Sequence, residues 1–363
     1  MKKSNLIITL LILCLPIFKT SAQDNAPNVI LITLDGLRWQ ELYTGADSLL
    51  ITNKQYVNDT TSLKSAFWRT SAKERRETLM PFFWKEIPKM GQLHGNRANG
   101  SMVDLTNTMR FSYPGYNEIL TGAADDTNIT SNDKINNPNK TILEIANNLP
   151  LYKGKVAAFG SWDVFPFIVN EERSGVPVNA GFESATKNLS EREIFLNELQ
   201  HQIPSPWGSV RLDAFTHHYA MEHIKKEHPK LVYIAYGETD DFAHDGDYEA
   251  YLKSAYSTDA MIKEIWEYTQ HDAFYKDNTI FIITTDHGRG TNPLETWKGH
   301  GSNIIGSEEV WLIAFGNGVV VSGEVDTEEQ LYSNQIAATI LQLLNISIDK
   351  KTMKGSAVNI IKN

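Results

Sequence analysis

Five short runs of apolar residues, separated by stretches of mostly helical character, constrain the fold of this 363-residue chain most strongly. Most of the runs are continuous rather than alternating, which is typical of strands buried on both faces of a parallel sheet. They are NVILITLDG (28–36), KVAAFGSW (155–162), KLVYIAYGE (230–238), NTIFIITTDHG (278–288) and EVWLIAFG (309–316). Helical patterns cover 211–228, 247–270 and 327–345. The sequence therefore predicts an α/β fold with a mainly parallel central sheet.

Length and composition favour one large domain, because 41% hydrophobic residues supply ample material for a core. We expect a single domain over 23–363, with insertions near 45–76 and 163–210, where the alternation of strands and helices is interrupted. The net charge of −10 disfavours binding to nucleic-acid polymers or anionic membranes, since both require a basic surface. A small anionic substrate is still compatible with this charge, because a bound metal ion can dominate locally.

The first residues, MKKSNLIITLLILCLPIFKTSAQD, predict a signal peptide over 1–22. Two lysines precede the thirteen-residue run Leu6–Phe18, and the small residues Thr20–Ala22 suit cleavage. A membrane span needs roughly twenty apolar residues, so we expect no stable anchor after cleavage. The protein is therefore predicted to be exported, either to a periplasm or outside the cell. The one cysteine, Cys14, lies in this segment, so the mature chain would contain no disulfide.

Acidic residues and histidines follow three of the predicted strands. They are Asp35, Asp240, His244, Asp286, His287 and His300. Each one taken singly is compatible with an ordinary turn or helix start. Together they are expected to share one site, because ligands bind outside the carboxyl ends of parallel strands. Mixed histidine and aspartate ligands indicate a divalent metal site.

Six motifs in the same order resemble those of the alkaline phosphatase superfamily, especially its nucleotide pyrophosphatase/phosphodiesterase branch. They are NVILITLDGLR, FSYPGYNEILTG (111–122), GETDDFAH, TTDHG, KGHGSN and SNQIAATILQLL. Each motif is weak alone, but their common order along the mature chain is specific. The resemblance implies a three-layer α/β/α sandwich and a two-metal hydrolase.

The resemblance also implies which residues hold the metals. One ion is assigned to Asp240, His244 and His300. The other is assigned to Asp35, Asp286, His287 and Ser112. Two Zn²⁺ ions are expected, because mixed His/Asp sites suit zinc, although the spacing leaves Mn²⁺ open.

Ser112 is the predicted nucleophile, which would form a phosphoserine that water then hydrolyses. It begins a probable helix, whose free N–H groups can meet a phosphate, although an ordinary N-cap serine is the alternative. Asn132 lies near the position of an asparagine that donates to a phosphate oxygen in the phosphodiesterase branch; an asparagine turn is the alternative. Arg110 would share the face of Ser112 on an extended strand and could reach a phosphate dianion, or could be a solvated arginine.

The predicted function is hydrolysis of a small-molecule phosphoester, with a diester favoured. A phosphomonoesterase remains an alternative, with Arg110, Arg38 and Arg289 as candidates for the extra positive charge that it needs. A sulfatase is disfavoured because Tyr116 stands where the formylglycine motif has arginine, and a phosphoglycerate mutase because those enzymes are cytosolic. An alternative of another class is an exported metal-bearing binding module without turnover. The oligomeric state and the physiological substrate are left open.

Other polar residues receive simpler interpretations. Asp245 and Asp247 are expected to stabilise the N-terminus of the helix over 247–270 through its dipole. Aromatic residues within 39–84 are expected to belong mainly to the core. The remaining histidines show no acidic ligand pattern and are predicted to be structural or surface groups: His94, His201, His217, His218, His223, His228 and His271.

Overall fold

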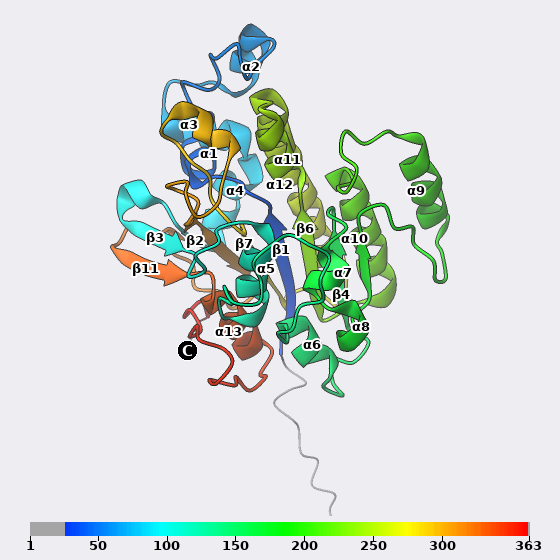
Figure 1. Cartoon of the computed structure of the whole chain (residues 1–363). Coiled ribbons are helices and arrows are strands. Elements are labelled where there is room, and N and C mark those ends of the chain that lie inside the picture. Colours follow the sequence, from blue (N-terminus) through cyan, green and yellow to red (C-terminus); the bar gives the residue numbers. More distant parts are fainter. Residues whose placement is uncertain (1–25, 362–363) are drawn as a thin grey trace, which may run out of the picture.

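The computed structural model describes residues 26–361, so the predicted signal peptide lies outside the described residues. Within these residues the main sheet has eight strands in the order β10–β2–β9–β7–β1–β6–β4–β5, where β10 is Gly323–Glu324 (Figure 1). Its largest parallel part consists of β1 (Asn28–Leu34), β4 (Val156–Gly160), β5 (Val178–Ala180), β6 (Leu231–Tyr236) and β7 (Thr279–Thr284), and β10 also pairs in parallel with β2. The predicted parallel sheet is therefore confirmed.

The fifth predicted strand, over 309–316, is divided between two sheets. Its second part, β9 (Leu312–Gly316), runs antiparallel to β7 and to β2 (Gly91–His94). Its first part, β8 (Glu309–Val310), joins a small second sheet. The apolar run continues through Trp311, so the sequence does not indicate that the segment is divided between two sheets.

The second sheet also corrects the predicted helix over 327–345. Residues Glu329–Tyr332 form β11, which pairs in parallel with β3 (Ser101–Asp104). The last helix, α13, covers only Gln335–Leu343. The strand that pairs with β11 lies more than 200 residues earlier in the chain. A local pattern of apolar residues cannot indicate a pairing partner at this distance.

Helices cover both faces of the main sheet (Figure 1). Ile30, Ile32 and Leu34 point toward one layer, while Val29 and Leu31 point toward the other. The first layer contains α1 (Trp39–Thr44), α2 (Thr60–Phe67), α3 (Ala72–Leu79), α4 (Pro81–Lys85), α9 (Glu191–Gln202), α10 (Asp213–Glu227), α11 (Glu238–Asp245) and α12 (Tyr248–His271). The second contains α5 (Ser112–Thr121), α6 (Ile142–Asn147), α7 (Phe165–Ile168) and α13. The fold is the expected three-layer α/β/α sandwich.

The two regions named as insertions contain regular elements. Region 45–76 includes α2 and the start of α3. Region 163–210 includes α7, α8 (Glu171–Ser174), β5 and α9, and β5 extends the main sheet beside β4. Their status as insertions in a single domain over 23–363 stays a prediction. Within residues 26–361, no helix is long and apolar enough to cross a membrane.

Candidate metal centre

The three strands that precede the predicted ligands end at the same level of the sheet. Leu34 of β1 is in register with Tyr236 of β6, and Thr33 is in register with Thr284 of β7. The loops that follow these strands therefore begin at one edge. This register brings Asp35 and Asp286 together, although 250 residues separate them in the sequence.

Four oxygen atoms gather around the Nε2 atom of His287. Asp35 Oδ1 lies at 3.3 Å, Asp286 Oδ2 at 3.4 Å and Asp240 Oδ1 at 3.6 Å. The fourth is Ser112 Oγ, at 3.4 Å. The structure thus brings the predicted nucleophile into one cluster with three predicted aspartate ligands.

The buried atoms of this cluster lack the hydrogen-bond donors that carboxylates require. Asp35 Oδ1 and Asp286 Oδ2 have no hydrogen-bond partner among residues 26–361. Nδ1 of His287 lies 3.0 Å from the carbonyl oxygen of Gly288 and therefore carries a hydrogen, which leaves Nε2 as the nitrogen that faces the cluster. Burial, followed by the charge of Asp240, raises the pKa of Asp35 well above its usual value. Burial and the charge of Asp35 do the same for the pKa of Asp286. A divalent cation bound here would supply the positive charge that these carboxylates lack, so the residues fit a metal.

The other predicted ligands lie beside this cluster. Nε2 of His244 is 2.9 Å from Nε2 of His300 and 3.2 Å from Oδ2 of Asp240. Burial and the neighbouring His287 lower the pKa of His300 to about 2, so its imidazole is neutral, as metal binding requires. Single ligand atoms of Asp240, His287 and His300 also lie within 4.8 Å of one another. Since His287 can complete either group, the division of ligands between two ions stays a prediction.

Tyr116 has a role at the centre that the sequence motifs did not reveal. Its hydroxyl donates to Asp35 Oδ2 at 2.7 Å, and it lies one turn after Ser112 on α5. The backbone N–H of Gly36 donates to Asp286 Oδ1 at 3.1 Å. Each carboxylate is therefore oriented by one donor, and its other oxygen faces the cluster. The four-residue spacing between Ser112 and Tyr116 could have indicated this shared helix face.

Arg289 links three segments of the chain at the centre. Its guanidinium is buried and donates to the Asp240 carboxylate, to the carbonyl of Gly36 at 3.1 Å and to the carbonyl of Lys298 at 2.6 Å. Burial alone would raise the pKa of Asp240. The charges of Arg289 and His244 outweigh this effect, so the pKa of Asp240 lies well below its usual range. The Arg289 guanidinium therefore directs its hydrogen bonds at the chain itself rather than at a substrate phosphate.

Arg38, another candidate for phosphate binding, is also buried. Its guanidinium pairs with both carboxylate oxygens of Glu41 and donates to the carbonyl of Gly290 at 3.2 Å. Both buried arginines therefore have their donors directed at the chain rather than at an incoming phosphate.

The extended backbone expected at Arg110 is wrong, while its role toward a phosphate stays a prediction. Its φ of 57° lies in the left-handed region. The side chain of Asn107 accepts the Arg110 N–H at 2.8 Å and turns the loop, while Glu118 of α5 accepts the Asn107 N–H at 2.8 Å. The guanidinium pairs with Glu308 at 3.2 Å. The sequence carried no sign of this turn, which depends on a side chain of the following helix.

Asn132 contacts the helix that Ser112 begins. Its Oδ1 accepts the backbone N–H of Tyr113 at 3.0 Å. This bond satisfies one of the free donors of the first helical turn. It also holds the side chain beside the predicted nucleophile, with the amide NH₂ pointing away from Tyr113.

Of the two aspartates expected to favour the following helix, only Asp247 does so. It is the N-cap of α12, and its side chain accepts the N–H of Ala250 at 2.9 Å. Asp245 instead ends α11 and accepts a hydrogen bond from the Trp207 indole at 3.0 Å. The short helix α11 was not expected from the sequence, so Asp245 was assigned to the wrong helix end.

Comparison with known proteins identifies the family. A sequence profile of the metalloenzyme superfamily matches residues 70–348, which is more than half of the chain. The chain belongs to this superfamily. The matched region contains every predicted metal ligand except Asp35.

Solved structures of alkaline-phosphatase-like enzymes share the fold of this metalloenzyme. The alkaline phosphatase PafA has a TM-score of 0.60 and 10% identity, with 93% of this chain and 99% of that chain covered. The lipoteichoic acid synthase LtaP from Listeria monocytogenes has a TM-score of 0.58 and 12% identity over 91% and 74%. The phosphonate monoester hydrolase SpPMH from Silicibacter pomeroyi has a TM-score of 0.53 and 14% identity over 92% and 76%. At these identities the likeness shows the fold.

Curated relatives match a smaller part of the metalloenzyme. The 2,3-bisphosphoglycerate-independent phosphoglycerate mutase of Ureaplasma urealyticum is 30% identical over 132 residues, which are 36% of this chain and 23% of the mutase. The mutase of Campylobacter jejuni is 24% identical over 170 residues, or 45% and 32%. The match thus spans less than a third of each relative's length. The chain is thus a metalloenzyme by its family, and its fold is that of alkaline-phosphatase-like enzymes.

Proposed function

We propose that this metalloenzyme hydrolyses a small-molecule phosphodiester through nucleophilic attack by Ser112. The observation that carries the proposal is the position of Ser112 Oγ, 3.4 Å from His287 Nε2 and at the first residue of α5. A neutral serine hydroxyl is a weak nucleophile and needs activation. Bound divalent cations, with Zn²⁺ favoured over Mn²⁺, would stabilise its alkoxide form and the charge of the phosphoryl group.

The chain's own residues would position the phosphate. Ser112 stands at a helix N-terminus, where the macrodipole favours an anion. The Asn132 side chain, anchored on the Tyr113 N–H, would donate from its amide NH₂ to a non-bridging phosphate oxygen. Tyr116 orients Asp35, and Arg289 orients Asp240, so the carboxylates would hold the cations without large rearrangement.

The positions of the arginines favour a diester over a monoester. A phosphomonoester carries a second negative charge and needs an additional cationic donor. Arg38 and Arg289 are buried and hydrogen-bonded within the chain, and Arg110 is paired with Glu308. A phosphodiester, with one negative charge, needs no such donor.

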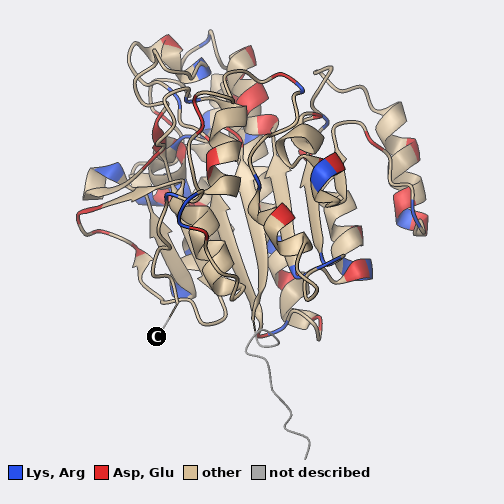
Figure 2. Cartoon of the chain, turned by 60° about the horizontal axis from the view of Figure 1, so that its bottom comes forward, with Lys and Arg blue, Asp and Glu red and all other residues tan. Residues whose placement is uncertain are grey.

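The charge distribution supports a small substrate rather than a nucleic-acid polymer. Figure 2 shows Lys and Arg interspersed with Asp and Glu over the visible elements. The net charge of −10 also disfavours binding to a nucleic-acid polymer. We also propose export of the protein, on the basis of the signal-peptide pattern in residues 1–22.

The test compares bis-p-nitrophenyl phosphate, p-nitrophenyl phosphate and an aryl sulfate, each with Zn²⁺ and with Mn²⁺. We expect the diester to have the highest kcat/KM. Ser112→Ala should abolish turnover, while the remaining assigned ligands Asp35, Asp286 and His287 should retain the metal in metal-replete protein. Ser65→Ala, which changes an exposed serine of α2, should behave as wild type. Metal-replete protein that hydrolyses none of the three would overturn the proposal. Metal binding without turnover, unaffected by Ser112→Ala, would instead support a binding module.

A further inference from the structure

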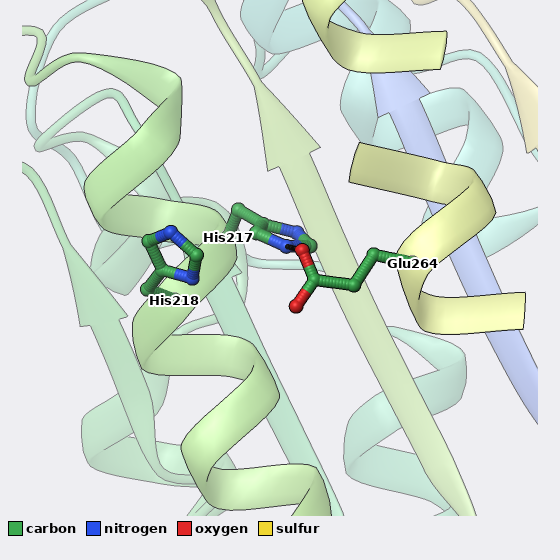
Figure 3. Close-up of side chains that lie close together, drawn as sticks. All are labelled: His217, His218 and Glu264. Carbon is green, nitrogen blue, oxygen red and sulfur yellow. Dashed lines mark hydrogen bonds and ion pairs between the residues drawn. The ribbon is translucent and has the colours of Figure 1, made fainter. Parts of the chain in front are cut away.

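A second group of metal-binding side chains lies on two helices of the first layer. His217 and His218 are neighbours on α10, and Glu264 lies on α12 (Figure 3). None of the three is a predicted ligand of the metal centre. We propose that His217, His218 and Glu264 bind a further divalent metal ion, which joins α10 to α12. The sequence showed no acidic ligand pattern for the histidines of α10, and the structure places Glu264 of α12 beside His217.

The geometry brings one possible ligand atom from each residue into a small volume. Nε2 of His217 is 3.1 Å from Oε2 of Glu264. Ligand atoms of all three side chains lie within 4.8 Å of one another. His217 is buried, His218 is half-buried and Glu264 is exposed, so the site is open to solvent on one side. An ion can therefore enter without unfolding of the helices.

The orientation of His217 is set from the protein interior. Its Nδ1 is 3.1 Å from the hydroxyl of Tyr236, the buried last residue of β6. Metal-binding histidines usually have their second ring nitrogen held in this way, which fixes the direction of the first. Burial also lowers the pKa of His217 to about 4, so the imidazole is uncharged at neutral pH. Its Nε2 is therefore directed at Glu264 and donates its hydrogen to that carboxylate. The other tautomer, with the hydrogen on Nδ1 and donated to the Tyr236 hydroxyl, would present the Nε2 lone pair to a cation.

The ligand set indicates the class of metal. Two imidazoles and one carboxylate suit Zn²⁺ and related ions such as Ni²⁺ and Co²⁺. Ca²⁺ and Mg²⁺ prefer oxygen ligands and are disfavoured. Three protein ligands leave room for water in a fourth position, as in an open zinc site.

Arg192 of α9 competes with the cation. Its Nη2 lies 3.0 Å from Nδ1 of His218, and its Nε lies 3.5 Å from Glu222. The guanidinium is hydrogen-bonded to one ring nitrogen of His218 and places a positive charge beside the site. Removal of this side chain is therefore expected to strengthen metal binding. If His217 and Glu264 formed only a hydrogen-bonded pair without metal affinity, removal of Arg192 would not change metal binding.

The test measures Zn²⁺ binding to the full-length protein by isothermal titration after the metal centre has been loaded. Wild type should bind one further equivalent. Loss of a side chain that only hydrogen-bonds to a metal ligand typically weakens metal binding about 10–100-fold. Glu264→Gln or His218→Asn should weaken Zn²⁺ binding by at least this factor, because each removes a direct ligand. Arg192→Gln should tighten binding. Glu267→Gln, an exposed carboxylate on the same helix, is the matched control and should bind as wild type.

The substituted side chains reach solvent, so the variants should fold. Thermal unfolding checks this, and added Zn²⁺ should raise the Tm of wild type and of Glu267→Gln but not of Glu264→Gln. The proposal is overturned if loaded wild type takes up no further equivalent. It is also overturned if Glu264→Gln and Glu267→Gln bind Zn²⁺ equally. The result is independent of hydrolysis, because no readout uses a substrate.

Discussion

Substitution of Gly115 by alanine tests how rigidly the predicted nucleophile is held against the metal centre. Gly115 lies on α5, three residues after Ser112, where the helix packs on the main chain of Asp286. A Cβ atom at this position would lie 2.2 Å from the Asp286 carbonyl oxygen and 2.9 Å from its carbonyl carbon. The absence of a side chain at 115 thus permits the approach of α5 to the end of β7.

The size of the effect follows from these distances. Ordinary van der Waals contact begins at 3.4 Å, so the helix must retreat by about 1 Å to accept the methyl group. Asp286 cannot move aside freely, because it follows β7 and its side chain accepts the Gly36 N–H. A displacement of about 1 Å can cost about 10²-fold in rate. Overpacking of this kind also costs about 1–3 kcal/mol of stability.

The assay is the kcat for bis-p-nitrophenyl phosphate, measured together with metal content and urea unfolding. We expect Gly115→Ala to lose about 10²-fold in kcat while it retains its metals and unfolds cooperatively. Gly208→Ala is the control, because a Cβ atom there meets nothing within 4 Å. A folded, metal-replete Gly115→Ala with the kcat of wild type would refute the idea that this contact positions Ser112.

Three further predictions concern other groups. Asn132→Ala should lower kcat by about 10²-fold, as expected for loss of a phosphate-oxygen donor, with metal content unchanged; an unchanged kcat would leave Asn132 only as the partner of the Tyr113 N–H. Burial raises the pKa of Asp259, which accepts the N–H groups of Phe82 and Phe83, to about 7. The folded chain therefore binds this proton more tightly than the unfolded chain, so the unfolding free energy should fall as pH rises from about 4 to 7. Asp259→Asn should flatten this dependence in urea unfolding, and an equally steep slope in the variant would contradict the assignment. Removal of metal with EDTA should lower the Tm, because the clustered carboxylates of the metal centre lose their counter-charge, and added Zn²⁺ should restore it; a Tm insensitive to EDTA would argue against bound metal.

The local sequence was sufficient to predict the central strands β1, β4, β6 and β7 and the edge of the sheet where the site lies. Continuous apolar runs specify strands buried on both faces, and parallel strands place their following residues at one edge. For this reason the sequence alone predicted that Asp35 and Asp286 would lie together. The same reasoning placed His287 in the cluster.

The tertiary structure alone decided which partner each polar side chain meets. Arg289 binds Asp240 rather than a substrate, and Arg110 is turned by Asn107. His217 meets Glu264 across two helices, 47 residues apart. Periodicity in the sequence reports which face of an element is buried, but not which element lies opposite. The chemistry of this protein therefore depends on contacts between distant segments, and these exist only after the layers have packed.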